Sequence, residues 1–148
     1  MWFRVACAKA GYSMTSTPLD LARTLAFKAD HDIEAVELLM AQGATDVICF
    51  HLQQAAEKIL KAYLQACSIE FPRTHDLDAL LDICAVVTDR LEVYRNRLEV
   101  FIPYAVMLRY DLDYEPTREE TRDGLVLVRE MRACLTSLRP ELATGSTE

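Results

Sequence analysis

Residues 50–64 read FHLQQAAEKILKAYL, and this stretch decides the fold that the chain is expected to adopt. Its apolar residues recur at spacings of three and four, which places them on one side of an α-helix. The pattern continues beyond both ends and predicts a helix over residues 45–68. The remaining side carries polar residues at the same spacing, called the polar row below: His51, Gln54, Lys58, Lys61 and Gln65. The segment therefore predicts an amphipathic helix with one buried stripe and one polar row.

Helical periodicity also appears on both sides of this segment. A T-x-x-D capping box at Thr17 begins an earlier helix, which we expect to end at Gly43 because glycine favours helix C-termini. Leucines at helical spacing predict a third helix over residues 76–87. The alternation typical of β-strands is absent from the sequence.

The C-terminal half continues the helical pattern with one interruption. Residues 89–109 are mostly helical in pattern, and Pro103 kinks or restarts the helix there. Thr117 opens a last helix with a second capping box, and Pro140 ends it. The sequence thus predicts an all-α protein, a four- to five-helix antiparallel up-and-down bundle.

The length of 148 residues suits one domain with one core. We expect residues 17–140 to form the bundle, residues 1–16 to be a poorly ordered N-terminal extension, and residues 141–148 to be a disordered tail. Met14 shortly precedes the Thr17 cap and is an alternative native start. The intact mass of the protein from its host would decide between Met1 and Met14.

Composition and charge exclude several classes of protein. A net charge of −7 argues against bulk nucleic-acid binding, so no DNA duplex is expected as a partner. Apolar runs are too short for a membrane span or a signal peptide, so no membrane is expected either. The 5 cysteines are odd in number and lack CxxC spacing, which favours free thiols in a cytoplasmic protein.

Three strings in one order resemble a known family. These are FHLQQAAEK in the central helix, THDLDALL after it, and PYAVMLRY before the last helix with its T-x-x-E box. Together they resemble the HEPN domain family over residues 25–138. The resemblance implies a four- or five-helix bundle that dimerises. It also implies a partner, because small HEPN proteins are often encoded beside a minimal nucleotidyltransferase in toxin–antitoxin-like pairs.

The family resemblance bears on activity in two ways. Many HEPN proteins are metal-independent RNases that use an arginine followed, four to six residues later, by a histidine, whereas others bind nucleotides or RNA. Arg109 occupies the arginine position here, but residues 114–116 are Tyr-Glu-Pro and supply no histidine. An imidazole exchanges protons near neutral pH, whereas the phenol of Tyr114 would do so only at about pH 10. The nuclease interpretation is therefore weakened.

The residues that we single out for phosphate or ligand binding are His51, Gln54, Lys58, Arg109 and Tyr110. Arg109 is a candidate phosphate fork and Tyr110 a candidate base-stacking residue. The polar row has a plainer interpretation as a solvated face with an ordinary Glu57–Lys61 pair. Arg109 likewise has a plainer role beside a carboxylate such as Asp111, Asp113 or Glu57, and Tyr110 a plainer role in the core or at its rim.

Catalysis has three candidate residues, namely Arg109, His51 and His75. His75 has a plainer role in a turn in which Asp76 caps the third helix. The sequence has no Gly-rich phosphate loop, no HExxH and no close set of metal ligands, so we expect no metal and no cofactor. Three hypotheses remain open: a nucleotide- or RNA-binding module with a nucleotidyltransferase partner, an RNase toxin with a degenerate motif, and a dimeric scaffold without a ligand.

Overall fold

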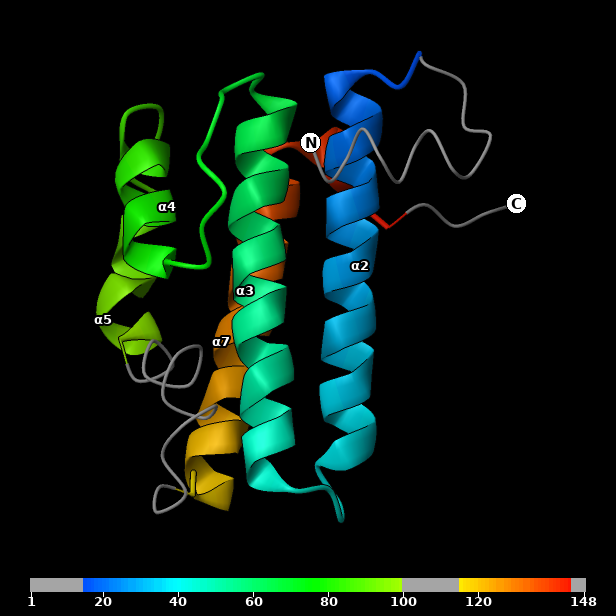
Figure 1. The fold of residues 1–148 in the computed structure, drawn as a ribbon, viewed down its shortest axis with the longest axis vertical. Coiled ribbons are helices and arrows are strands. Elements are labelled where there is room, and N and C mark those ends of the chain that lie inside the picture. Colours follow the sequence, from blue (N-terminus) through cyan, green and yellow to red (C-terminus); the bar gives the residue numbers. More distant parts are fainter. Residues whose placement is uncertain (1–14, 100–114, 145–148) are drawn as a thin grey trace.

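The computed structural model describes residues 15–99 and 115–144, and these form helices without any strand (Figure 1). Within these residues, the α-helices are α2 (Pro18–Leu39), α3 (Thr45–Ala66), α4 (Leu77–Ala85), α5 (Arg95–Leu98) and α7 (Arg118–Leu138). Two short 3-10 helices, η1 (Glu92–Tyr94) and η3 (Pro140–Leu142), complete the described structure. The prediction of an all-α bundle is confirmed.

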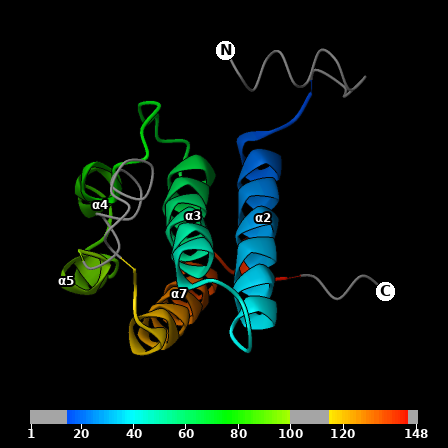
Figure 2. The same ribbon diagram turned by 60° about the horizontal axis from the view of Figure 1, so that its bottom comes forward.

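The central helix α3 has neighbours on three sides. In Figures 1 and 2, α2 lies on one side of α3, and α4 and α5 lie on the other. Helix α7 lies behind α3 in Figure 1. Helices α2 and α3 are antiparallel. Arg118, which begins α7, donates to the carbonyl oxygens of Met40 (3.0 Å) and Gly43 (2.6 Å) at the α2–α3 turn. Helix α7 therefore runs parallel to α3, as the second and fourth helices of an up-and-down bundle do.

Both predicted capping boxes form. The backbone N–H of Asp20 donates to Thr17 Oγ1 (3.1 Å), and the Thr17 N–H donates to the Asp20 carboxylate (3.0 Å). Thr117 and Glu120 repeat the arrangement at the start of α7, with distances of 3.1 and 2.8 Å. Each box satisfies backbone donors that the first helical turn leaves free, which fixes where the helix begins.

Helices α2 and α3 end in different ways, α2 before a turn that contains Gly43 and α3 before a residue with a left-handed backbone. Helix α2 ends at Leu39 rather than at Gly43, which lies in the turn instead. A Cβ atom at Gly43 would come within 2.6 Å of Leu39 Cβ, so the turn requires glycine. After α3, Ser68 adopts a left-handed φ of 56°, and the next N–H, that of Ile69, donates to the carbonyl oxygen of Leu64. This is a Schellman motif with serine in place of glycine.

Leu142 is buried in the core, with 1% of its surface exposed. We expected a disordered tail from residue 141 onward, but the 3-10 helix η3 holds Glu141 and Leu142 against the bundle. Arg132 explains this anchoring because its guanidinium pairs with Asp30 (2.7 and 3.1 Å) and donates to the carbonyl oxygen of Leu142 (2.9 Å).

Three segments lie outside the described residues, namely 1–14, 100–114 and 145–148. They contain Arg109, Tyr110, Pro103 and most of the proposed N-terminal extension.

Candidate functional site

From His51 onward, the polar row is the accessible line of helix α3. Between residues 51 and 66, every residue outside the row is buried, and the five row residues are all partly exposed. Their spacing keeps them on one side of α3 while α2, α4 and α7 cover the rest. The prediction that the five residues share one face is confirmed.

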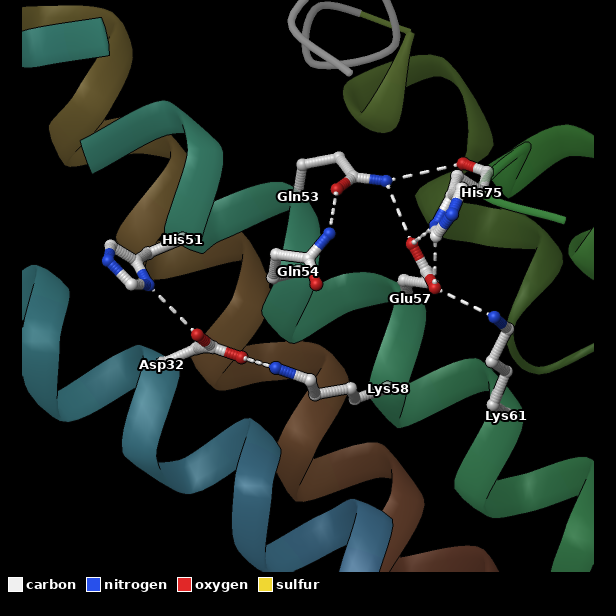
Figure 3. Close-up of polar contacts among 8 residues, drawn as sticks. All are labelled: Asp32, His51, Gln53, Gln54, Glu57, Lys58, Lys61 and His75. Atoms are coloured by element: carbon white, nitrogen blue, oxygen red, sulfur yellow. Dashed lines mark hydrogen bonds and ion pairs between the residues drawn. The ribbon is translucent and has the colours of Figure 1, made fainter. Parts of the chain in front are cut away.

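One end of the row is held by a buried carboxylate on α2 (Figure 3). Asp32 is 8% exposed, and its Oδ1 lies 2.9 Å from His51 Nδ1. Its other oxygen forms an ion pair with the ammonium group of Lys58. Burying a carboxylate is costly unless it is paired, so these two contacts allow Asp32 to occupy the α2–α3 boundary.

A second buried carboxylate lies within α3 itself. Glu57 is 5% exposed and accepts from Lys61 Nζ at 2.7 Å. The Nδ1 atom of His75, in the connection before α4, lies 3.0 and 3.1 Å from the two carboxylate oxygens of Glu57. The expected Glu57–Lys61 pair is therefore present, and it extends to a histidine from another segment (Figure 3).

Two glutamines join this second cluster. Gln53, 1% exposed, donates from Nε2 to Glu57 Oε2 and to the His75 carbonyl oxygen, both at 3.2 Å. Its Oε1 accepts from Gln54 Nε2 at 2.9 Å. Gln54 therefore has a fixed orientation on the accessible line, between His51 and Lys58 on one side and the Glu57 cluster on the other (Figure 3).

At this surface, negative charge lies beneath positive or protonatable groups. The carboxylates of Asp32 and Glu57 are buried, whereas the cationic or protonatable side chains that they hold are more exposed, with His75 at 77%. Each lysine ammonium has three N–H donors, and one contact to a carboxylate leaves the others for solvent or a ligand. The surface thus presents N–H groups outward over a balanced pair of buried negative charges.

A family model matches this chain. The model is that of the HEPN domain, and it matches residues 22–138, which include every described α-helix except the first turn of α2. The chain belongs to the HEPN domain family. No curated protein and no solved structure matches the HEPN chain. None of its described helices is both long enough and apolar enough to cross a membrane.

The structure gathers four of the residues singled out in the HEPN sequence. His51, Gln54, Lys58 and His75 border one surface around α3. Asp76 also has its plainer role, because its side chain accepts from the first N–H groups of α4 at 3.0 and 3.3 Å. The positions of Arg109 and Tyr110 relative to this surface are outside the described residues.

Sequence reasoning did not identify Asp32 and Gln53 as part of the site. A signal was available for Asp32, because it falls in the apolar register of its helix beside Ile33 and Val36. A carboxylate in a buried register requires a partner, and such residues mark polar networks. Gln53 likewise lies beside the buried stripe of α3.

Several arginines elsewhere on the HEPN bundle are paired with acids. Arg95 contacts Asp78 (2.9 Å) and Asp82 (2.7 Å), and Arg97, Arg129 and Arg132 pair with Glu130, Glu37 and Asp30. These contacts fit the interpretation of a mixed solvated surface. The polar row differs from them because its acids are buried beneath its cations.

The described cysteines are free thiols. Cys49, Cys84 and Cys134 are buried, and Cys67 is partly exposed with Arg139 Nη1 at 3.7 Å from its Sγ. Burial raises the pKa of Cys49 and of Cys84 to about 12, which keeps both protonated and unreactive at neutral pH. Within residues 15–99 and 115–144, no cluster of three His, Cys, Asp or Glu side chains has the arrangement of a metal site.

Proposed function

We propose that this HEPN protein is a cytoplasmic, dimeric binding module that holds a nucleotide or an RNA phosphate. We further propose that it acts with a minimal nucleotidyltransferase in a toxin–antitoxin-like pair. The observation that carries the first part is the polar row, the accessible line of α3, whose acids lie underneath and whose N–H groups face outward.

The proposed contacts follow from the chemistry of each side chain. Lys58 keeps N–H donors free after its contact with Asp32, and these suit phosphate oxygens. His51 and Gln54 lie beside Lys58 and suit a second oxygen or a base edge. Arg109, as a bidentate fork, and Tyr110, as a stacking surface, complete the proposed ligand set from residues outside the described structure.

Dimerisation and a protein partner are supported by exposed apolar side chains on α2 and α3. Large apolar side chains are exposed on α2 and α3, namely Phe27, Leu38, Val47 and Phe50. Exposed apolar residues grouped with polar ones are typical of interaction surfaces. Sedimentation equilibrium tests the dimer, and co-purification with a minimal nucleotidyltransferase from the same host tests the partner.

Calorimetric titration tests the binding module. Nucleotides and short single-stranded RNA should release or absorb heat with the native protein, and Lys58→Ala and Arg109→Ala should weaken binding at least about tenfold, the loss expected from one charged hydrogen bond. Arg122→Ala is the matched control, because Arg122 is exposed on α7 and outside the row. An absence of heat with every ligand would reject the binding module and favour the scaffold.

One contact favours a second candidate, the RNase toxin. Asp32 holds His51 through Nδ1, and a carboxylate that orients an imidazole is a common arrangement in acid–base catalysis. On this alternative, His51 or His75 replaces the missing motif histidine and Arg109 stabilises phosphate charge. RNA should then be cleaved in the presence of chelator, and Arg109→Ala should abolish cleavage. Intact RNA at high protein concentration would count against this candidate.

A further inference from the structure

Both histidines of this surface meet a buried carboxylate through the same ring atom. His51 Nδ1 lies 2.9 Å from Asp32, and His75 Nδ1 lies 3.0 Å from Glu57 Oε2. Because a carboxylate only accepts, Nδ1 carries the proton in each ring. The other ring nitrogen, Nε2, lies on the far side of each imidazole from its carboxylate (Figure 3).

This fixed tautomer determines what each histidine offers to a ligand. In a neutral ring, the outward Nε2 has a lone pair, which repels the oxygen of an anion. The ring cannot move its N–H to Nε2 without placing the Nδ1 lone pair against the carboxylate. Only a second proton makes Nε2 a donor, and it also makes the ring positive.

The charge balance of the surface also makes its attraction for anions depend on protonation of the histidines. Lys58 and Lys61 are matched by Asp32 and Glu57, so the surface has no excess positive charge while the histidines are neutral. The charged groups that face His51 are Asp32 from α2 and Lys58 on its own helix.

His75 is surrounded in a similar way. It faces Glu57, which also holds Lys61, and it adjoins Asp76 in the chain. Protonation of His51 and His75 would turn a neutral surface into one with two excess positive charges and two additional outward donors.

We propose that the polar row, together with His75 beside it, binds anions by proton uptake, with His51 and His75 as the residues that take up the protons. This inference rests on the phosphate-binding function proposed above and adds its regulation by pH. Binding should tighten as the pH falls through the range in which histidine gains a proton, about pH 8 to 5. Each proton taken up on binding changes the affinity by as much as about tenfold per pH unit.

The probe is a short oligouridylate without terminal phosphates, because neither its phosphodiesters nor its bases titrate in this range. Calorimetry at about pH 7, in two buffers with different ionisation enthalpies, counts the protons taken up. We expect between one and two protons per RNA bound, and a dissociation constant at least about tenfold larger at about pH 8.

Three glutamine variants assign the protons. His51→Gln and His75→Gln should each lower the proton count and flatten the pH dependence, because glutamine donates without titrating. His31→Gln is the matched control, since His31 lies on α2 with its ring against Phe27, at a centroid distance of 4.3 Å. The His31→Gln variant should keep the proton count and the pH dependence of the native protein. This result would show that the protons are taken up at the row and not through a general effect of protein charge.

The outcomes distinguish the inference from the function on which it rests. RNA binding with equal affinity at both pH values, or a pH dependence that persists in the His51→Gln, His75→Gln double variant, overturns proton-linked binding and leaves the binding module standing. No binding at either pH overturns the binding module itself. Circular dichroism of each variant at both pH values shows whether it is folded.

Discussion

Replacing Glu57 by alanine should destabilise the bundle considerably more than an ordinary helical substitution does. Glu57 is 5% exposed and accepts from Lys61, His75 and the buried Gln53. The contact with His75 contributes little because that ring is 77% exposed. Gln53 keeps a second acceptor, the His75 carbonyl oxygen, and is therefore not left unsatisfied.

The main loss is the bond with Lys61, whose side chain is only 16% exposed. A charged hydrogen bond contributes about 1.5–3 kcal/mol, and an ammonium left without its partner near the core adds to the cost. Since Lys61 can still reach water, we expect Glu57→Ala to lower the free energy of unfolding by about 2–3 kcal/mol. Glu57→Gln keeps the acceptor and should cost about 1 kcal/mol.

Urea unfolding followed by circular dichroism measures these values at one fixed protein concentration. Glu34→Ala, at an exposed position of α2, is the control and should change stability by less than about 0.5 kcal/mol. A double-mutant cycle of Glu57→Ala with Lys61→Ala should give a coupling energy of about 1 kcal/mol or more. A Glu57→Ala variant as stable as the Glu34→Ala control would refute the view that Glu57 is a buried, partner-dependent charge.

Three further predictions concern the backbone and the thiols. Gly43→Ala should cost about 1–3 kcal/mol in urea unfolding, because its Cβ would lie 2.6 Å from Leu39 Cβ; a neutral effect would mean that the turn adapts freely. Ser68→Gly should stabilise by about 1 kcal/mol, because glycine adopts the left-handed φ of 56° without strain, and a loss of stability would contradict this. Cys67, partly exposed beside Arg139, should react with Ellman's reagent in the folded protein, and Cys67→Ser should lower the number of reactive thiols by one; an unchanged number would assign the reaction to another thiol.

Much of the fold could be predicted because its determinants are local in sequence. The capping boxes at Thr17 and Thr117 depend on residues three positions apart, and both helices begin where the boxes predict. The polar row also depends on helical spacing alone. The end of α2 was less predictable, because Gly43 serves the close approach of the turn to Leu39 rather than the helix end itself.

The partners of the row could be predicted only in part, because they come from three segments. The Glu57–Lys61 pair follows from spacing within one helix. The contacts of Asp32 and His75 join residues 19 and 18 positions apart from His51 and Glu57, and they depend on how α2 and the connection before α4 pack against α3. The register of Asp32 indicated that it needs a partner, but periodicity does not tell which one.

The measurement that tests the binding face most directly is an NMR titration of the isotope-labelled protein with oligouridylate at about pH 6. We predict that the largest shift changes fall on the side-chain amide of Gln54 and on the backbone of residues 51–65. The outer side of α2, including His31 and Glu34, should change little. Shift changes confined to α2 or α7, with the row unaffected at saturation, would contradict the account.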